Sequence, residues 1–310
     1  MHLTLRQLLI FAAIAKTGST TAASHRVALS QSATSAALNE LEKILGARLF
    51  DRVGKRLILN DNGRTLLPQA RATLDAAANI ESDFSVGIRT PHAVPPINLR
   101  IAASTTIGNY LLPELIAGFR ETFPHARIEV QIHNTRHASA AVGRFEVDMG
   151  LIEGPSHEPD VQMEPWMEDE LAILCAPGHP LALERQRINS KALRKASWLL
   201  REAGSGTREA VEQALRPHLL QLNEEIQAGS TEAIKQAVAA GLGLTCLSLV
   251  AVRDALTLGR LTVLETTLPR LVRPFYLIRH RHKQVSTGLA RFMDHCRAAI
   301  VYVEPAASLS

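Results

Sequence analysis

Aromatic residues and cysteines are scarce in this sequence, and their scarcity limits how the protein is built. Only 4% of its 310 residues are aromatic, so a hydrophobic core must rest on Leu, Ile, Val and Ala. The three cysteines, Cys175, Cys246 and Cys296, are far apart and fit neither a CxxC motif nor the spacing of zinc ligands. We interpret them as buried free thiols of a protein in a reducing compartment, and a redox sensor is the alternative.

Long apolar runs are also absent. No stretch approaches the ~20 consecutive apolar residues with which a helix crosses a bilayer. Residues 1–19 are mildly apolar, but they lack the basic start and the uninterrupted apolar segment of a signal peptide. We therefore expect a cytoplasmic protein that does not bind membranes.

The common catalytic motifs are missing as well. The sequence contains no GxxxxGK[ST], GxSxG or HExxH pattern. His280 and His282 form an HxH pair in an expected strand, which we interpret as a solvated strand end, with metal binding as the weaker alternative. A nucleophilic role for Ser205 would need a base that the sequence does not identify. We expect no enzymatic activity, no metal and no cofactor.

Positive charge is concentrated at the N-terminus. Residues 1–60 hold eight Lys and Arg and three acidic side chains, a net charge of +5, whereas the whole chain carries +4. The remaining 250 residues therefore carry −1. A basic head on a nearly neutral body is typical of a nucleic-acid-binding domain joined to a domain with another task.

Three helices are predicted in this basic head. Apolar side chains recur at helical spacing over residues 3–16, 20–26 and 31–45. Gly18 and Gly46 end the first and third helices, and Ser19 and Ser30 are good N-caps for the second and third. Two short helices joined by a tight turn form the helix-turn-helix pattern.

In that pattern the first turn of the last helix enters the major groove of DNA. Its hydroxyl and amide side chains can hydrogen-bond base edges, and they belong to Gln31, Ser32, Thr34 and Ser35. Residues 48–51 and 57–59 are predicted strands of a β-hairpin wing. The basic tip of that wing, which we expect to contact phosphate or the minor groove, carries Arg52, Lys55 and Arg56. A small helical subdomain with a solvated charged face is the alternative.

The head resembles a known family. The run LRQLLIFAAIAKTGSTTAASHRVALSQSATSAALNELEKILGARLFDR contains an AA pair, a SQSATS opening and an L-x-x-LE-x-x-LG-x-x-LF-x-R ending. It is similar to the DNA-binding head of the LysR-type transcriptional regulators. The resemblance implies that Gln31, Ser32, Thr34 and Ser35 lie at DNA-reading positions and that Arg52 and Arg56 lie in the wing. At Ala36 many members carry a longer polar or basic residue, so the base sequence that is read stays open.

A long helix is predicted to follow the head. Its apolar residues alternate at spacings of three and four, and they are Leu66, Ala70, Leu74, Ala77, Ile80, Phe84 and Ile88. Such a seam packs along a partner helix. The family resemblance implies antiparallel dimerisation, and packing on its own chain is the alternative. Pro68 is expected to kink or weaken this helix, and residues 90–96 (TPHAVPP) form a hinge.

From Ile97 onward, strand-like and helix-like segments alternate. Strands are predicted over residues 98–104, 127–133, 147–153, 170–177, 197–202, 224–230, 242–249, 261–265 and 273–280. Helices are predicted over residues 107–123, 137–145 and 190–195, from Thr207, from Thr231 and after Gln284. This alternation predicts mostly parallel sheets flanked by helices, in two lobes that crossing strands join.

The family resemblance covers essentially the whole chain, and it implies an effector region similar to a type 2 periplasmic binding protein. The predicted fold is a helical winged helix-turn-helix domain, a long linker helix and an α/β effector region of two lobes. We expect these domains to span residues 1–60, 61–92 and 93–310. One lobe is expected at about 93–165 and 268–303, and the other at about 166–267.

Three predicted strand ends offer hydroxyls and backbone N–H groups at the start of a helix, which together suit an anion. The candidate ligand-binding residues are Ser104, Thr105, Thr106, Glu202, Ser205, Gly206, Thr207, Arg208 and Thr231. Arg201 adds positive charge, whereas Glu202 opposes an anion. The alternative is that Ser205 and Thr207 only cap the next helix.

The segment REAGSGTRE is similar to segments in the branch of the family that regulates sulfur assimilation and carbon fixation. That resemblance suggests sulfite, sulfate or a phosphorylated metabolite as effector. The predicted function is a dimeric or tetrameric regulator of promoter DNA. Its effector changes DNA binding or the contact with RNA polymerase. A solute-binding protein and a small-molecule enzyme of the α/β class are the alternatives.

Overall fold

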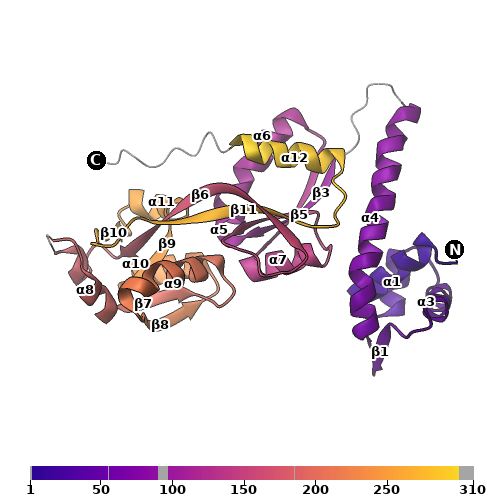
Figure 1. Cartoon of the computed structure of the whole chain (residues 1–310), viewed down its shortest axis with the longest axis horizontal. Helices are drawn as coiled ribbons and strands as arrows, with labels where there is room; N and C mark the ends of the chain where they lie inside the picture. The colour runs from indigo at the N-terminus through magenta and orange to yellow at the C-terminus, as the bar shows by residue number, and fades with distance from the viewer. Residues whose placement is uncertain (1, 55, 90–96, 185, 300–310) are drawn as a thin grey trace. The chain divides into compact units, whose positions relative to one another are not determined.

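The computed structural model describes residues 2–54, 56–89, 97–184 and 186–299 of the chain (Figure 1). The chain divides into two compact units. One contains the N-terminal helices with the long helix after them, and the other contains the strands and helices from residue 97 onward.

The first unit begins with the helices α1 (Leu5–Thr17), α2 (Thr20–Arg26) and α3 (Gln31–Leu45). Ser19 Oγ accepts from the N–H of Ala22, and Ser30 Oγ accepts from that of Ala33. Gly46 ends α3 with a left-handed φ of 64°. The predicted bounds of α2 and α3 are confirmed, because local capping chemistry determines where these helices begin and end.

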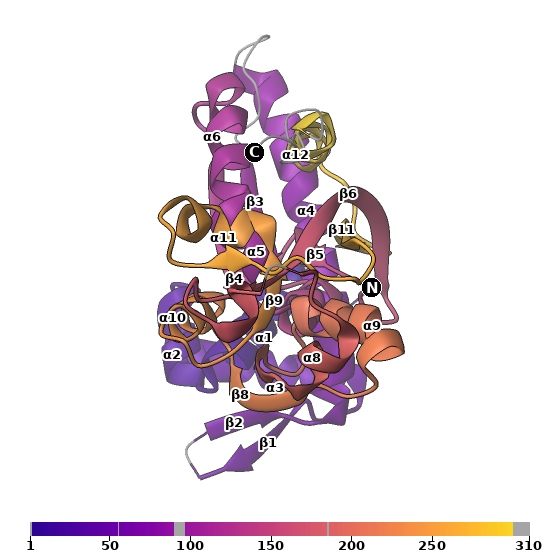
Figure 2. The ribbon, with the colours of Figure 1, turned by 90° about the vertical axis from the view of Figure 1, so that its left-hand side faces the viewer.

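A two-stranded ribbon follows these helices, formed by β1 (Phe50–Val53) and β2 (Arg56–Leu59) (Figure 2). The strands pair in antiparallel register, with Val53 opposite Arg56. Phe50 reaches back into the core of the head, where its ring centroid lies 5.5 Å from that of Phe11. The predicted hairpin is therefore present, and its strands begin and end within two residues of the predicted positions.

The long helix α4 spans Asp61–Arg89 and continues through Pro68 (Figure 1). Leu67 and Ala70 are buried in the core of the head, whereas Ile80 is 61% exposed. Although α4 is long, no helix among the described residues is both long enough and apolar enough to cross a membrane.

The second unit contains all the remaining elements. Its strands are β3 (Asn98–Ser104), β4 (Arg127–His133), β5 (Met149–Glu153), β6 (Val161–Cys175), β7 (Ser197–Arg201), β8 (Asn223–Ala228), β9 (Thr245–Ser248), β10 (Thr262–Val263) and β11 (Leu271–His280). Its helices are α5 (Thr105–Tyr110), α6 (Leu112–Thr122), α7 (Thr135–Gly143), the short η1 (Pro180–Ala182), α8 (Ser190–Lys195), α9 (Gly206–Leu219), α10 (Thr231–Ala239), α11 (Leu249–Thr257) and α12 (Thr287–Ala298). Each predicted strand has a counterpart, and α11 was not predicted.

The main sheet of this unit is mixed. Within the described residues its strand order is β10-β6-β11-β5-β3-β4, and β9 also pairs with β6. β3 is parallel to β4 and β5, but β11 is antiparallel to β5 and β6, and β6 is antiparallel to β9 and β10. The expectation of mostly parallel sheets is therefore wrong, because the two long strands that cross the unit return in the opposite direction (Figure 1).

The first lobe consists of β3–β5, α5–α7 and α12. Ile101 of β3 packs in a core that contains Phe119 of α6 and Phe292 of α12, whose rings meet edge to face at 5.1 Å. The next residue, Ala102, packs instead in a core with Val142 of α7. Side chains alternate between the faces of a strand, so helices cover both faces of this sheet.

The second lobe consists of β7–β10 and α8–α11. Trp198 and Leu200 of β7 pack with Leu215 of α9, whereas Leu199 packs with Val238 of α10. β7 pairs in parallel with β8. The parallel pairs β3–β4 and β7–β8 place their carboxyl ends, where polar residues follow, at the starts of helices.

Two of the differences between predicted and observed bounds have local reasons. The helix predicted over 107–123 is broken at Leu111, because Pro113 lacks an N–H and favours the first turn of a new helix. β6 begins at Val161, nine residues before the predicted strand. Its first half contains Pro165 beside a register shift in β11, and a proline in a strand obscures the pattern.

Candidate DNA interface and effector site

The first turn of α3 is largely open to solvent. Gln31 and Ser32 are exposed, and Gln31 Nε2 donates to Thr20 Oγ1 of α2 at 3.2 Å. Ser35 is half-buried, and Asn39 one turn further is exposed. Ser32, Ser35 and Asn39 follow one another at spacings of three and four, so they share one helix face. Asn39 was not among the predicted DNA-binding residues, although its helical spacing from Ser32 and Ser35 could have indicated it.

Thr34 does not belong to this exposed face. It is fully buried, and its hydroxyl donates to the carbonyl of Ser30 at 3.0 Å. The period of the helix places Thr34 with Leu38 and Leu41, which are also buried. The prediction that Thr34 reads DNA is therefore wrong, because its side chain is buried against α3 itself.

The wing exposes basic side chains. Arg52 of β1 and Arg56 of β2 are exposed, and Gly54 at the tip has a left-handed φ of 61°. Lys55, the third predicted residue, lies outside the described residues. Arg52 and Arg56 thus place positive charge on the ribbon of β1 and β2, which Figure 2 shows.

In the second unit, Glu153 at the end of β5 is the centre of a buried network. Its Oε1 accepts from Thr106 N at 2.7 Å, and its Oε2 accepts from Thr207 Oγ1 at 2.6 Å and Arg273 Nη1 at 2.7 Å. Arg273 of β11 also donates through Nε to Asp169 Oδ2 of β6 at 2.7 Å. Thr106 and Thr207, both predicted ligand-binding residues, do come together. They meet around a carboxylate of the protein itself.

The two carboxylates of this network respond differently to Arg273. Burial alone would raise the pKa of Glu153, but Arg273, the Thr207 hydroxyl and Thr106 together lower it from 4.5 to about 2. Burial raises the pKa of Asp169, against the opposing effect of Arg273. One guanidinium thus holds Glu153 firmly ionised and joins both lobes to the crossing strands.

Arg201 at the end of β7 is the centre of a second cluster. Its side chain is 2% exposed, and its guanidinium donates to Thr231 Oγ1 at 2.7 Å and Thr105 Oγ1 at 3.4 Å. Arg201 Nε lies 2.9 Å from Glu202 Oε2, and Asn134 Nδ2 donates to Glu202 Oε1 at 3.0 Å. Thr105, Glu202 and Thr231 were predicted from three separate segments, and the fold gathers them around one cation.

The helix starts beside these clusters are tightly packed. Ser205 is buried, and its Oγ accepts from an N–H in the first turn of α9, so this residue does cap the helix. Gly206 N donates to Thr135 Oγ1 at 3.2 Å, and a Cβ on Gly206 would lie 1.8 Å from the Glu153 carbonyl oxygen. Only glycine fits there. Ser104 Oγ is buried and has no hydrogen-bond partner within the described residues.

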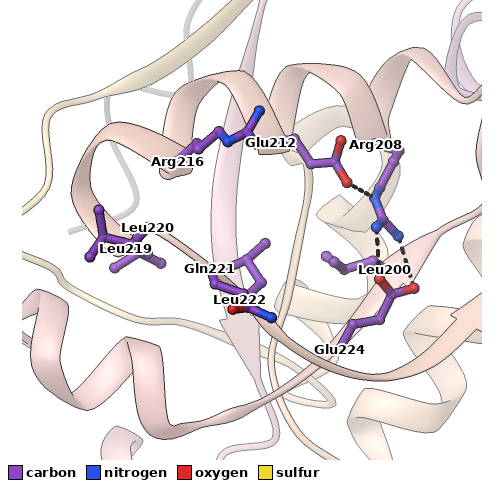
Figure 3. Close-up of a pocket in the computed structure, with 9 residues that line it drawn as sticks. All are labelled: Leu200, Arg208, Glu212, Arg216, Leu219, Leu220, Gln221, Leu222 and Glu224. Carbon is purple, nitrogen blue, oxygen red and sulfur yellow. Dashed lines mark hydrogen bonds and ion pairs between the residues drawn. The ribbon is translucent and has the colours of Figure 1, made fainter.

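Arg208 lies between two carboxylates, those of Glu212 and Glu224 (Figure 3). Its guanidinium donates to both oxygens of Glu224 at 2.9 and 2.7 Å and also pairs with Glu212. The hydrogen bonds to Glu224 are the main reason that the pKa of Arg208 is raised. These groups line a cavity of about 310 Å³ between α9 and the chain before β8. Two carboxylates thus already hold its guanidinium, although Arg208 also borders the larger cavity described next.

A larger cavity of about 550 Å³ lies between the two lobes. Arg136 and Ser139 of α7 line it from the first lobe, and Ser205 and Glu209 line it from the second. His157 Nε2 lies 3.1 Å from Glu209 Oε1 at this cavity, so the lobes also meet there. Its volume falls within the ~300–1,000 Å³ of typical small-molecule pockets.

Sequence reasoning missed Glu153, Asp169 and Arg273. A signal was available, because Glu153 and Arg273 each flank an apolar strand segment, MGLI and PFYLI. A charge in such a place is buried only with a partner. The partner could not be named from the sequence, since 120 residues separate Glu153 from Arg273.

The cysteines are inert in this fold. All three are free and buried, as one of the two interpretations expected. Burial raises the pKa of Cys175 to about 11 and the pKa of Cys246 and Cys296 to about 12. Thiols with such pKa values form little of the reactive thiolate near pH 7. The described residues also contain no group of three or more His, Cys, Asp or Glu placed to hold a metal.

Two family models match the chain. The model described as bacterial regulatory helix-turn-helix protein, lysR family, matches residues 5–64. The model described as LysR substrate binding domain matches residues 95–300.

Relatives extend over most of the chain. It is 48% identical over 301 residues to the uncharacterized HTH-type transcriptional regulator YeiE of Escherichia coli K12, which covers 97% of this chain and 99% of the relative. It is 32% identical to the RuBisCO operon transcriptional regulator of Allochromatium vinosum, covering 96% and 99%. It is also 32% identical to the HTH-type transcriptional regulator CysL of Bacillus subtilis, covering 82% and 84%. The predicted resemblance to the sulfur and carbon-fixation branch is confirmed.

Solved structures share the fold. Full-length OxyR from Pseudomonas aeruginosa, solved as a cysteine-to-aspartate variant, matches 97% of this chain and 96% of its own with a TM-score of 0.78 at 24% identity. The regulatory domain of CcmR from Synechocystis PCC6803, in complex with 2-PG, matches 66% of this chain and 98% of its own with a TM-score of 0.61 at 29% identity. The predicted fold class is confirmed. The chain belongs to the LysR family of DNA-binding transcriptional regulators with an effector-binding domain, and it is not an enzyme.

Proposed function

We propose that this chain is a ligand-responsive regulator whose head binds promoter DNA and whose two lobes bind a small anionic effector. The observation that carries the effector part is the buried guanidinium of Arg201, on which Thr105 and Thr231 converge from different strand ends. A buried guanidinium suits an oxyanion, because its N–H groups donate to the oxygens of the anion. The two hydroxyls accept from Arg201 and so hold the guanidinium in place.

The effector site combines these strand ends with the cavity between the lobes. Residues 203–205 line that cavity and directly follow Arg201 and Glu202. Of the predicted residues, the proposed site retains Ser104, Thr105, Glu202, Ser205 and Thr231. Three further predicted residues do not face the effector in this proposal, because they bind Glu153 and Thr135 of the protein itself. They are Thr106, Gly206 and Thr207.

A small oxyanion such as sulfite or sulfate, or a phosphorylated metabolite, is the effector class that these donors favour. The CcmR regulatory domain, 29% identical to this region, was solved with 2-PG. Sulfite, sulfate and 2-PG are therefore the probes with which to begin.

The DNA surface consists of the exposed face of α3 and the wing. Gln31, Ser32 and Ser35 stay in the proposal, and Asn39 joins them, because amides and hydroxyls can read base edges in the major groove. Arg52 and Arg56 are proposed to contact phosphate or the minor groove. The net charge of +5 on residues 1–60 supports binding of the head to the DNA phosphate backbone.

Self-association to a dimer or tetramer is the third part of the proposal. The apolar seam of α4 and the 61% exposure of Ile80 support it, since a seam of this spacing packs against a second helix. A two-fold assembly would bind a partly palindromic promoter, and RNA polymerase is a further candidate partner. The effector acts only through the difference in its affinity for two arrangements of the assembly.

The test is a thermal-shift series on the full chain with sulfite, sulfate and 2-PG. At about 100 times its Kd, a ligand should add about 2.7 kcal/mol to the free energy of unfolding. The double variant Thr105→Val with Thr231→Val, which keeps side-chain shape but removes both hydroxyls, should lose most of this shift. Thr122→Val on the exposed surface of α6 is the matched control and should retain it.

Binding of promoter DNA without effector should be equal in the wild type and the double variant. A shift with an uncharged compound, together with none for any of the three anions, would refute the anionic effector and leave the DNA-binding function in place.

A further inference from the structure

The carboxylate of Glu202 occupies the place on Arg201 that an external oxyanion would take. It pairs with Arg201 through both oxygens, at 2.9 Å from Nε and 3.1 Å from Nη2. Its Oε1 also accepts from Asn134 Nδ2, at 3.0 Å. Two guanidinium N–H groups and one amide N–H thus converge on this carboxylate, and these are donors of the kind that bind sulfite or phosphate in proteins.

The two members of the pair differ in their freedom to move. The Arg201 side chain is 2% exposed, and Thr231, Thr105 and the carbonyl oxygen of Gly229 hold it from three sides. The Glu202 side chain is 23% exposed and so has access to solvent. Arg201 is therefore a fixed cation, whereas Glu202 is an anion that can turn outward.

Charge balance makes such a movement conditional. A buried guanidinium without an anion is strongly unfavourable, because the low-dielectric interior does not replace the water that it has lost. Glu202 can leave Arg201 only when another anion arrives. The hydrogen bond from Asn134 joins the first lobe to Glu202 of the second, so the exchange also removes one contact between the lobes.

We propose that Glu202 is a built-in competitor of the effector, which an incoming oxyanion displaces from Arg201 and Asn134. This inference rests on the proposed anionic effector and deepens it. Competition from Glu202 raises the Kd of the site for the anion. Loss of the hydrogen bond between Asn134 and Glu202 couples anion binding to the contact between the two lobes.

The experiment compares the full-length wild type with Glu202→Gln, which keeps the shape of the side chain but removes its charge. Isothermal titration with sodium sulfite and with 2-PG, in a buffer free of other oxyanions, measures the Kd of each protein. Glu184→Gln, on an exposed acid of the second lobe, is the matched control. A double variant, Arg201→Gln with Glu202→Gln, removes both charges.

Glu202→Gln should lower the Kd for the anion that binds the wild type by at least about tenfold, because the internal competitor has lost its charge. It should also lower the Tm without anion, and the double variant should recover that loss. Glu184→Gln should match the wild type in both measurements.

Anion binding to the wild type that Glu202→Gln leaves unchanged or weakens would overturn the displacement and keep the proposed anionic effector. Failure of sulfite and 2-PG to bind either protein would overturn the anionic effector itself. If Glu202→Gln does not fold, a double variant no more stable than it would show that Arg201 and Glu202 are not a charge-balancing pair, and the inference would fall.

Discussion

A single guanidinium between two carboxylates lies where the two lobes meet. Arg273 neutralises Glu153 on one side and Asp169 on the other, with all three side chains no more than 2% exposed. Thr207 adds a hydroxyl from the second lobe to the same carboxylate of Glu153. At the scale of residues, these buried charge pairs therefore connect the first lobe, the second lobe and the crossing strands.

Glu153 should make the stability of the protein depend on acid pH. Its pKa is about 2 in the folded state against an ordinary 4.5, so the unfolded chain binds more protons between these values. The stabilisation is fully present above pH 4.5 and is lost as the pH falls toward about 2. Its size is about 3 kcal/mol, from 1.36 kcal/mol per pKa unit.

Glu153→Gln should lower the free energy of unfolding by about 3 kcal/mol at pH 7, and its stability should fall less steeply in acid. Urea unfolding of both proteins from pH 7 down to pH 3 measures this difference. Parallel pH profiles of the two proteins would contradict it. Asp169, whose pKa moves in the opposite direction, is present in both proteins, and the charge of Glu153 is only the smallest cause of its shift.

At the scale of elements, α3 and the wing divide DNA recognition between them. The exposed face of α3 carries uncharged groups such as Gln31 and Ser32, whereas the wing carries Arg52 and Arg56. Uncharged donors and acceptors distinguish bases, and cations bind the backbone of any sequence. Mutations in α3 should therefore change which DNA sequence is preferred, whereas mutations in the wing should change the affinity for all sequences.

Arg52→Ala should weaken binding to all DNA sequences by a similar factor and reduce the slope of log K against log salt by about one. Fluorescence anisotropy with a promoter fragment and an unrelated duplex, at several salt concentrations, measures both effects. Arg120→Ala, on an exposed residue of α6, is the matched control and should change neither. A salt slope identical to that of the wild type would remove Arg52 from the phosphate contacts.

At the scale of the whole molecule, each compact unit has a core of its own, and α4 belongs to the head. The first turns of α4 are buried there through Leu67 and Ala70. Further along, Ile80 stays 61% exposed on the seam predicted to bind a second copy. An apolar side chain that its own chain leaves uncovered is available to a partner helix.

Ile80→Glu should therefore reduce self-association without lowering the Tm of the head, because a charge at a helix–helix seam lacks a partner. Sedimentation velocity at micromolar concentration measures the oligomeric state. Ala78→Glu, also exposed but outside the seam, is the matched control. An assembly equally stable in both variants would place the self-association surface elsewhere.

Local chemistry alone determined much of this protein. Ser19, Ser30 and Gly46 mark the ends of α2 and α3, because capping involves residues only a few positions apart. Asn98–Ser104 and Arg127–His133 were predicted in full as strands, since no turn residue interrupts their strand-like sequence. The family resemblance, too, depends on a run of adjacent residues.

Only the tertiary structure decided which predicted site residues can reach a ligand. Thr34 faces inward, and Arg208 is held by Glu212 and Glu224. Thr207 donates to Glu153, which lies 54 positions away in the sequence. Residue type states what a side chain can bind. Whether that capacity is already used depends on partners that folding brings from distant segments, and no local pattern contains them.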